Sequence, residues 1–297
     1  MKNSFLGALY LSLAASIWGG MYVVSKYVLG FIPPVTLVWL RYVIGFIVLY
    51  GILKFTQRKS KLPTKITKKD WLLIAWIGFI GYFVSILCQF IGTKLSDAHT
   101  GSLITAATPA FIIIFARILL KEKLTMRKVL AMLISTFGVI VVVGWNVKLG
   151  DYFLGSIILV GAALTWALLS VFVKLASYRN SSLIITTYAI FFALVFTTPL
   201  MLWEVQRNTL SFANIYVILG IIYLGTFSTA GAFFLWNKGL ELMDAGIGSL
   251  FFFFQPIVGS FLGWLFLGEH LNVNFFVGGA LILLGVLIIS LKNELDT

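Results

Sequence analysis

A stretch of 43 residues occurs twice in this chain. Residues 97–139 align without a gap with residues 244–286, at a shift of 147 residues, and eleven of the 43 positions are identical. Shared leucines and valines mean little in an apolar chain, but shared polar residues and prolines at fixed offsets are informative. The informative pairs are Asp97 with Asp244, Pro109 with Pro256, and Glu122 with Glu269. We infer an internal duplication, which restricts the fold to two copies of one unit.

Ten long apolar runs occupy most of the sequence. Hydrophobic residues make up 60% of the chain and charged residues 11%, whereas about a quarter of a typical soluble domain is charged. A soluble fold cannot bury this much apolar surface, so the solvent of the chain is mostly lipid. A spanning helix needs about 20 predominantly apolar residues. The candidate spans are residues 5–25, 35–53, 71–93, 100–119, 129–146, 153–173, 182–203, 213–236, 247–267 and 274–291. The expected fold class is an all-α polytopic membrane protein with ten transmembrane helices.

The duplication extends over the whole chain. Trp18 in the first run matches Trp166 in the sixth at a shift of 148 residues. Further matched pairs, at a shift of 147, are Gly78 with Gly225 and Gly92 with Gly239. The repeated unit is therefore five helices long, with one copy in residues 1–148 and the other in residues 149–297. Because five is odd, the second copy is inverted in the membrane, and inverted repeats are typical of secondary transporters with a substrate site near the bilayer midplane.

Basic residues are distributed unevenly between the two sides of the membrane. With the N-terminus in the cytoplasm, sixteen of the 22 Lys and Arg residues fall in cytoplasmic segments, four in outer segments and two within spans. Cytoplasmic loops of membrane proteins are enriched in Lys and Arg, so we expect a plasma-membrane protein with both termini in the cytoplasm. The net charge of +12 lies between apolar runs and not on a polar domain. The lipid bilayer, and no nucleic acid, is therefore the expected partner.

Local patterns within the runs resemble a known family. The first run contains Trp18-Gly19 and the second contains Trp39-Leu40-Arg41, while the fourth and ninth each carry a proline followed by a glutamate that ends the run. With its ten spans and its tandem five-helix unit, the chain resembles the drug/metabolite transporter superfamily, specifically its EamA branch. The resemblance implies a polytopic transporter of small metabolites, with amino-acid efflux as a frequent theme. Small four-helix multidrug exporters of this superfamily carry a glutamate in the middle of their first helix, where this chain has Leu13-Ala14-Ala15, so their mechanism is not implied.

Arg41 is the ionisable side chain that lies well inside a span. An arginine at the centre of a membrane helix costs roughly 2.5–3.5 kcal/mol on insertion scales, so such residues usually face a cavity. One interpretation is that Arg41 binds a substrate carboxylate through paired hydrogen bonds. The other is that Arg41 snorkels from the outer end of its helix.

Polar and aromatic side chains recur at helical spacing in matched runs of the two halves. Tyr82, Ser85 and Gln89 follow one another at three- and four-residue steps in the third run, and Thr229 and Trp236 match Tyr82 and Gln89 in the eighth. Lipid does not favour these groups, so we expect them to face inward, either into a substrate cavity or into contacts between helices. For Trp18 and Trp166, deep in their runs, lining and core packing both remain open. The candidate substrate-binding residues are Trp18, Arg41, Tyr82, Gln89, Thr105, Trp166, Thr229, Trp236 and Gln255.

Matched prolines and glutamates form a second set of candidates, for gating. Pro109 and Pro256 each remove a backbone hydrogen bond at the same depth of their runs, which allows either a hinge or a static bend. Glu122 and Glu269 end the same runs, and Glu122 has lysines on both sides. The two glutamates are either gating residues, with Glu122 paired to Lys121 or Lys123, or solvated charges at helix ends.

The sequence lacks the residues that proton-coupled transporters and common membrane enzymes need. The ten runs contain no Asp or Glu, and proton-coupled transporters normally keep a titratable carboxylate in the pathway. The sequence has no HExxH or GxSxG motif and contains two histidines, so we expect no enzyme, no metal and no cofactor. A channel usually needs a selectivity ring formed by oligomer symmetry, whereas this chain already contains a pseudosymmetric pair.

These observations together predict a secondary transporter that works by facilitated diffusion or exchange. The expected activity is export of small metabolites, with amino acids first, by alternating access in a monomer or weak dimer. The alternative is export of lipophilic or aromatic drugs and cations, because the chain is rich in aromatic residues: nine Trp, eleven Tyr and 27 Phe.

Overall fold

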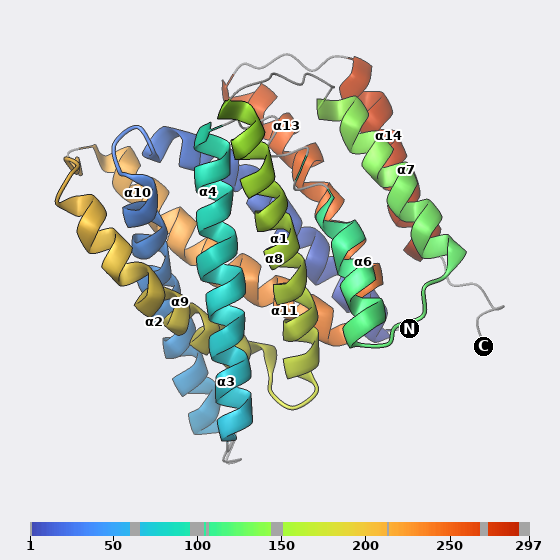
Figure 1. The fold of residues 1–297 in the computed structure, drawn as a ribbon, viewed down its shortest axis with the longest axis horizontal. Helices are drawn as coiled ribbons and strands as arrows, with labels where there is room; N and C mark the ends of the chain where they lie inside the picture. Colours follow the sequence, from blue (N-terminus) through green and yellow to red (C-terminus); the bar gives the residue numbers. More distant parts are fainter. Residues whose placement is uncertain are drawn as a thin grey trace.

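The computed structural model describes residues 2–59, 66–95, 104, 107–143, 151–212, 214–267 and 273–290. Regular structure in these ranges is entirely helical (Figure 1). The first half contains α1 (Lys2–Val28), α2 (Pro34–Lys59), α3 (Lys68–Ile77), η1 (Gly78–Ser85), α4 (Ile86–Leu95), α6 (Thr108–Leu119) and α7 (Met126–Val143). The second half contains α8 (Asp151–Ser177), α9 (Ser182–Val205), α10 (Ile215–Tyr223), η2 (Leu224–Gly231), α11 (Ala232–Leu242), α12 (Ala245–Ser249), η3 (Leu250–Phe253), α13 (Phe254–Leu267) and α14 (Val273–Ser290).

Six helical segments in the described ranges are long and apolar enough to cross a membrane. They are Ser4–Met21, Pro34–Arg58, Lys68–Gly92, Phe153–Ser177, Ser182–Val205 and Ile215–Leu242. The other four runs expected from the sequence fall on shorter helices, namely α6, α7, the segment from α12 to α13, and α14. The chain is thus an all-α, polytopic membrane protein, as its apolar composition predicts.

Glutamates from distant parts of the chain bind the starts of several helices. The first N–H groups of a helix have no partner within the helix, and a carboxylate can accept their hydrogen bonds. At the start of α2, Glu204 accepts from the backbone N–H groups of Val35 (3.2 Å) and Thr36 (2.6 Å). At the start of α9, Glu241 accepts from the backbone N–H of Ser182 (3.2 Å). These contacts fix how the helices meet at the ends of the bundle.

Two π-helical stretches lie at matching places in the two halves. The π-helix η1 joins α3 to α4, and the π-helix η2 joins α10 to α11; their first residues, Gly78 and Leu224, are 146 positions apart. Such stretches are rare and are frequently found at functional sites. Each one presents a carbonyl oxygen to an aromatic side chain. The Tyr42 hydroxyl donates to the carbonyl of Tyr82 in η1, and Trp18 Nε1 donates to the carbonyl of Ser228 in η2 at 3.1 Å.

Helices α7 and α14 pack along each other beside the rest of the bundle (Figure 1). A Cβ placed on Gly138 would lie 2.7 Å from the carbonyl oxygen of Gly278, and a Cβ placed on Gly285 would lie 2.7 Å from that of Ala131. Ser135 Oγ donates to the carbonyl of Ile282, 147 positions away, at 3.5 Å. Each glycine therefore allows close approach of the other helix. The two contacts are equivalent, because Gly138 matches Gly285 and Ala131 matches Gly278 at the repeat shift of 147 residues.

Candidate functional site

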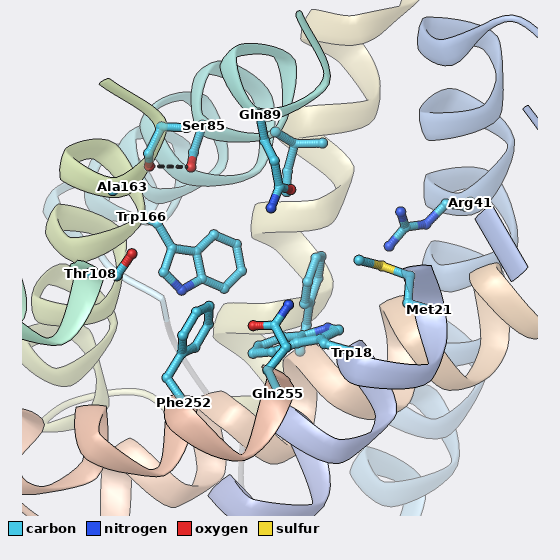
Figure 2. A pocket seen from close by; sticks show the side chains of 13 residues that line it. Trp18, Met21, Arg41, Ser85, Gln89, Thr108, Ala163, Trp166, Phe252 and Gln255 are labelled. Atoms are coloured by element: carbon cyan, nitrogen blue, oxygen red, sulfur yellow. Dashed lines mark hydrogen bonds between the residues drawn. The ribbon is translucent and has the colours of Figure 1, made fainter. Parts of the chain in front are cut away.

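A pocket in the interior of the bundle collects side chains from nine helical elements of both halves (Figure 2). Its empty volume is about 500 Å³, including the part that is open to the outside. The thirteen lining residues are Trp18, Met21, Arg41, Ser85, Ile86, Gln89, Thr108, Ala162, Ala163, Trp166, Phe233, Phe252 and Gln255. Mostly apolar walls with a few converging polar groups are typical of a small-molecule binding site.

Arg41 reaches this pocket from α2 and is 3% exposed. Its Nε donates to Thr229 Oγ1 at 3.1 Å and its Nη2 donates to Ser228 Oγ at 3.3 Å. Neither partner carries a charge, and none of the ion pairs between described residues includes Arg41. Arg41 is thus buried beside a pocket shared by both halves and does not reach the surface from the end of its helix. The guanidinium is held in place by hydroxyls and keeps its charge available for an anionic group.

Trp18 forms a fixed aromatic surface of the pocket. Its indole Nε1 bonds to the backbone of η2, as described above, which sets the orientation of the ring. Its ring centroid lies 5.4 Å from that of Trp166, 5.7 Å from Phe233 and 6.1 Å from Phe252. Edge-to-face and tilted arrangements at these distances are the favourable geometries of aromatic pairs. The pocket thus has a rigid aromatic wall as well as a cationic group.

Three of the predicted substrate-binding residues lie behind the lining. The ring of Tyr82 stacks on Phe233 at 4.5 Å, and its hydroxyl accepts a hydrogen bond from Asn237 at 3.0 Å. Trp236 is 1% exposed and donates from Nε1 to Ser170 Oγ at 3.3 Å. Thr229 supports Arg41 and also donates to the carbonyl of Leu224 at 2.7 Å. These side chains position the wall and the guanidinium, and do not line the pocket themselves.

The other predicted binding residues fall into two groups. Five of them line the pocket, namely Trp18, Arg41, Gln89, Trp166 and Gln255. Thr105 lies outside the described residues, as does the gating candidate Glu269. The eight other lining residues were not among the candidates: Met21, Ser85, Ile86, Thr108, Ala162, Ala163, Phe233 and Phe252. Apolar residues in an apolar run carry no signal that distinguishes a pocket wall from a lipid-facing surface.

Two buried polar atoms of the lining have no hydrogen-bond partner among the described residues. They are Trp166 Nε1, a donor, and Gln255 Oε1, an acceptor. Their residues are 8% and 7% exposed, respectively. Buried polar groups in native proteins are nearly always paired with protein or water, so unpaired atoms in a pocket mark places where a solute or water can bind.

The gating candidate Glu122 is neither solvated nor paired with its sequence neighbours. Its carboxylate accepts from the backbone N–H groups of Ala245 (2.7 Å) and Gly246 (3.1 Å), and it lies 3.3 Å from Lys128 Nζ. The pairing with Lys121 or Lys123 expected from the sequence is thus wrong, because the chain turns after α6 and brings Lys128 at the start of α7 to the carboxylate. Lys121 makes this turn with a φ of 58°, in the left-handed region that side chains rarely adopt.

Lys128 and Gly246 complete the group around Glu122. Lys128 Nζ lies 3.6 Å from Asp244 Oδ2 as well, and its side chain is 6% exposed. A Cβ placed on Gly246 would lie 3.2 Å from Glu122 Oε2, so a larger residue there would crowd the carboxylate. We call Glu122, Lys128, Asp244 and the N–H groups of Ala245 and Gly246 the Glu122 cluster. It joins the end of α6 in the first half to the start of α12 in the second half.

The two matched prolines occupy different places in their helices. Pro109 is the second residue of α6, and Pro256 is the third residue of α13, directly after the 3-10 helix η3. At Pro109 the N–H that proline lacks would have had no partner within the helix, whereas at Pro256 the upstream residues are helical and the missing N–H removes a hydrogen bond. Pro256 therefore lies inside a continuous helical stretch, whereas Pro109 lies at the beginning of α6.

Comparisons with known proteins agree with this architecture. The model of the EamA-like transporter family matches the chain twice, over residues 5–144 and 153–291. The uncharacterized transporter YetK of Bacillus subtilis (strain 168) is 28% identical over 291 residues, covering 96% of this chain and 87% of that protein. The uncharacterized transporter YoaV of the same strain is 26% identical over 299 residues, covering 96% of each chain.

The fold also matches a solved structure. A chain titled "Crystal structure of protein" superposes with a TM-score of 0.79 at 20% identity, covering 95% of both chains. At this identity the likeness concerns the fold alone. The family model, in contrast, covers nearly the whole sequence in two copies. The chain belongs to the EamA-like transporter family.

Proposed function

We propose that this transporter exports amino acids across the plasma membrane by facilitated diffusion or exchange. The observation that carries the proposal is the guanidinium of Arg41, buried in a pocket shared by both halves, bonded to two hydroxyls and without a carboxylate partner among the described residues. Charge-assisted, bidentate hydrogen bonds make arginine well suited to bind a carboxylate. The aromatic wall around Trp18 would receive the apolar part of the solute.

The proposed framework is ten transmembrane helices in two inverted five-helix repeats, residues 1–148 and 149–297. Three observations support it: the double match of the family model, the matched π-helices and the reciprocal glycine contacts between α7 and α14. In such proteins one repeat moves against the other around a central site, which is open to one side of the membrane at a time. The distribution of Lys and Arg supports an orientation with both chain termini in the cytoplasm.

The proposed inner gate is the Glu122 cluster. It joins the two halves through charge-assisted hydrogen bonds between Glu122 and the backbone of α12, and such bonds are roughly twice as strong as neutral ones. With the termini in the cytoplasm, the end of α6 lies on the cytoplasmic side. Opening toward the cytoplasm then requires these bonds to break. Pro109 and Pro256, near the starts of α6 and α13, are the proposed hinge points, and Glu269 is the proposed counterpart of Glu122 on the outer side.

The lining supports a mechanism without proton coupling. The thirteen lining residues include no Asp, Glu or His. Proton-coupled transporters normally use such a group in the pathway to bind and release the proton. Net flux would then follow the gradient of the solute, or of a second solute in exchange.

Counterflow in proteoliposomes tests the substrate class. Vesicles containing the purified protein are loaded with one unlabelled amino acid, and entry of the same labelled amino acid is followed. We expect accumulation of labelled neutral amino acids with apolar side chains, and a KM raised at least about tenfold in Arg41→Ala, because hydrogen bonds to a charged group are lost. Arg58→Ala, an exposed arginine on the same helix, is the control and should leave the KM unchanged.

The alternative substrates are lipophilic or aromatic drugs and cations, and the rings of Trp18, Trp166, Phe233 and Phe252 favour them. These solutes need no guanidinium. The alternative would be supported, and the amino-acid proposal rejected, by two results together. The wild type shows no counterflow of any amino acid, and it transports such a drug or cation at a rate that Arg41→Ala leaves unchanged.

A further inference from the structure

Gln255 places a buried acceptor in the central pocket. Its Oε1 has no hydrogen-bond partner within the described part of the chain, and the residue is 7% exposed. Leaving a buried acceptor unpaired costs free energy. Gln255 is on α13, and Figure 2 shows its amide beside Trp18, with the nitrogen on the side of Gln89 and the oxygen on the side of Phe252 and Trp166. The pocket therefore offers a site for a hydrogen-bond donor of the solute.

The other polar groups of the lining restrict what this donor can be. Arg41 is the cationic residue among the thirteen, and none of them is acidic. A solute bound by its carboxylate at Arg41 thus finds, among these thirteen residues, no negative side chain for a positive group of its own. An ammonium group has three N–H donors and no acceptor, so its partners in this lining are neutral oxygens, of an amide or a hydroxyl, and the faces of aromatic rings. Gln255 Oε1 is such an oxygen, and it has no hydrogen-bond partner among the residues that the structure describes.

We propose that Gln255 recognises the ammonium group of a zwitterionic amino acid whose carboxylate is bound by Arg41. This inference rests on the proposed function and adds to it the residue that distinguishes an amino acid from a carboxylic acid of the same shape. The ammonium donates an N–H to Gln255 Oε1, the carboxylate accepts from the guanidinium, and the side chain lies against the aromatic wall. A solute with only one of the two charged groups loses one of the two anchors.

Three solutes that share one aromatic ring separate the contributions of the ammonium and the carboxylate group to binding. Phenylalanine has both charged groups, 3-phenylpropionate has the carboxylate alone, and phenethylamine has the ammonium alone. Their inhibition constants are measured against counterflow of labelled phenylalanine in the wild type, Gln255→Met and Gln89→Met. Gln89→Met is a matched control because it exchanges an amide for a thioether at another position of the same pocket. For a variant that does not transport, the three affinities are measured by tryptophan fluorescence of the purified protein.

We expect the wild type to prefer phenylalanine to both partial analogues. Gln255→Met should raise the inhibition constant of phenylalanine about tenfold, as expected for the loss of one hydrogen bond to a charged group. It should leave the inhibition constant of 3-phenylpropionate unchanged. Gln89→Met should change the inhibition constants of phenylalanine and 3-phenylpropionate by the same factor. Equal effects of Gln255→Met on phenylalanine and 3-phenylpropionate, or a selective loss in Gln89→Met instead, would overturn the role of Gln255 while leaving the proposed function in place. Absence of counterflow for every amino acid in the wild type would overturn both.

Discussion

The carboxylate of Glu122 accepts a hydrogen bond of 2.7 Å from the backbone N–H of Ala245, 123 positions further along the chain. The same carboxylate binds Lys128 of the first half, which also faces Asp244 of the second. A single glutamate thus ties the end of α6 to the start of α12. Because the contact crosses from one half to the other, it must change if the two halves move apart at this end.

Replacement of Glu122 by glutamine should favour opening at the end where the Glu122 cluster lies. The amide keeps the shape but removes the negative charge that attracts two N–H groups and an ammonium. Loss of charge-assisted bonds of this kind shifts a two-state equilibrium about tenfold. The readout is the rate at which a membrane-impermeant maleimide labels Ile113→Cys in a Cys88→Ser background. Ile113 is 5% exposed and lies close to Gly246, beside the cluster.

The control for this prediction is Lys123→Ala. Lys123 is an exposed neighbour of Glu122 in the sequence, so its removal changes the local charge without breaking the cluster. We expect no change in the labelling rate. If Lys123→Ala accelerates labelling as much as Glu122→Gln does, the effect comes from the overall charge of the turn and not from the cluster.

Replacement of Thr229 by valine should weaken substrate binding although Thr229 does not line the pocket. Its hydroxyl oxygen accepts the hydrogen bond from Arg41 Nε, so valine leaves the guanidinium less well oriented. We expect the KM of counterflow to rise about threefold to tenfold, the effect of one hydrogen bond. Thr226→Val is the matched control in the same π-helix, because Thr226 bonds only to the carbonyl of Ile222 in its own helix among the described contacts. Equal effects of the two substitutions would show that Arg41 does not depend on Thr229.

An imposed pH gradient should leave the rate of counterflow unchanged. The lining residues include no side chain that titrates near neutral pH, so no proton is expected to accompany the solute through the pocket. The measurement compares amino-acid entry into proteoliposomes with equal and with unequal internal and external pH. A clear acceleration by the gradient would contradict facilitated transport and would require a titratable group elsewhere in the pathway.

The sequence indicated which kinds of polar group the pocket contains, but not which side chains line it and which lie behind the lining. Arg41, Gln89 and Gln255 stood out because polar side chains are rare in apolar runs, and all three line the pocket. Tyr82 and Trp236 were expected to face it and lie behind it. The expectation assumed α-helical spacing, whereas a π-helix precedes or contains each of these positions, and its i to i+5 bonding rotates the residues that follow.

The partner of Glu122 could not be predicted from the sequence for a different reason. Neighbouring residues such as Lys121 and Lys123 are the obvious partners when only the order of residues is known. The actual contacts depend on the left-handed turn at Lys121 and on the arrival of α12 from the second half. Contacts between the halves follow from tertiary packing, which the duplication indicates only in outline.

Replacement of Gly285 by alanine should destabilise the pairing of α7 with α14. The new Cβ would lie 2.0 Å from Ser135 Oγ and 2.7 Å from the carbonyl oxygen of Ala131, so the helices must separate. Overpacking of this kind costs about 1–3 kcal/mol, which should lower the apparent Tm of the protein in detergent. Gly279→Ala in the same helix is the control, because no atom lies within 4 Å of its added Cβ. Since alanine favours helices over glycine by about 1 kcal/mol, Gly279→Ala should leave the Tm unchanged or raise it. A Tm that is equal for the two variants would mean that the close approach of α7 and α14 at Gly285 does not contribute to stability.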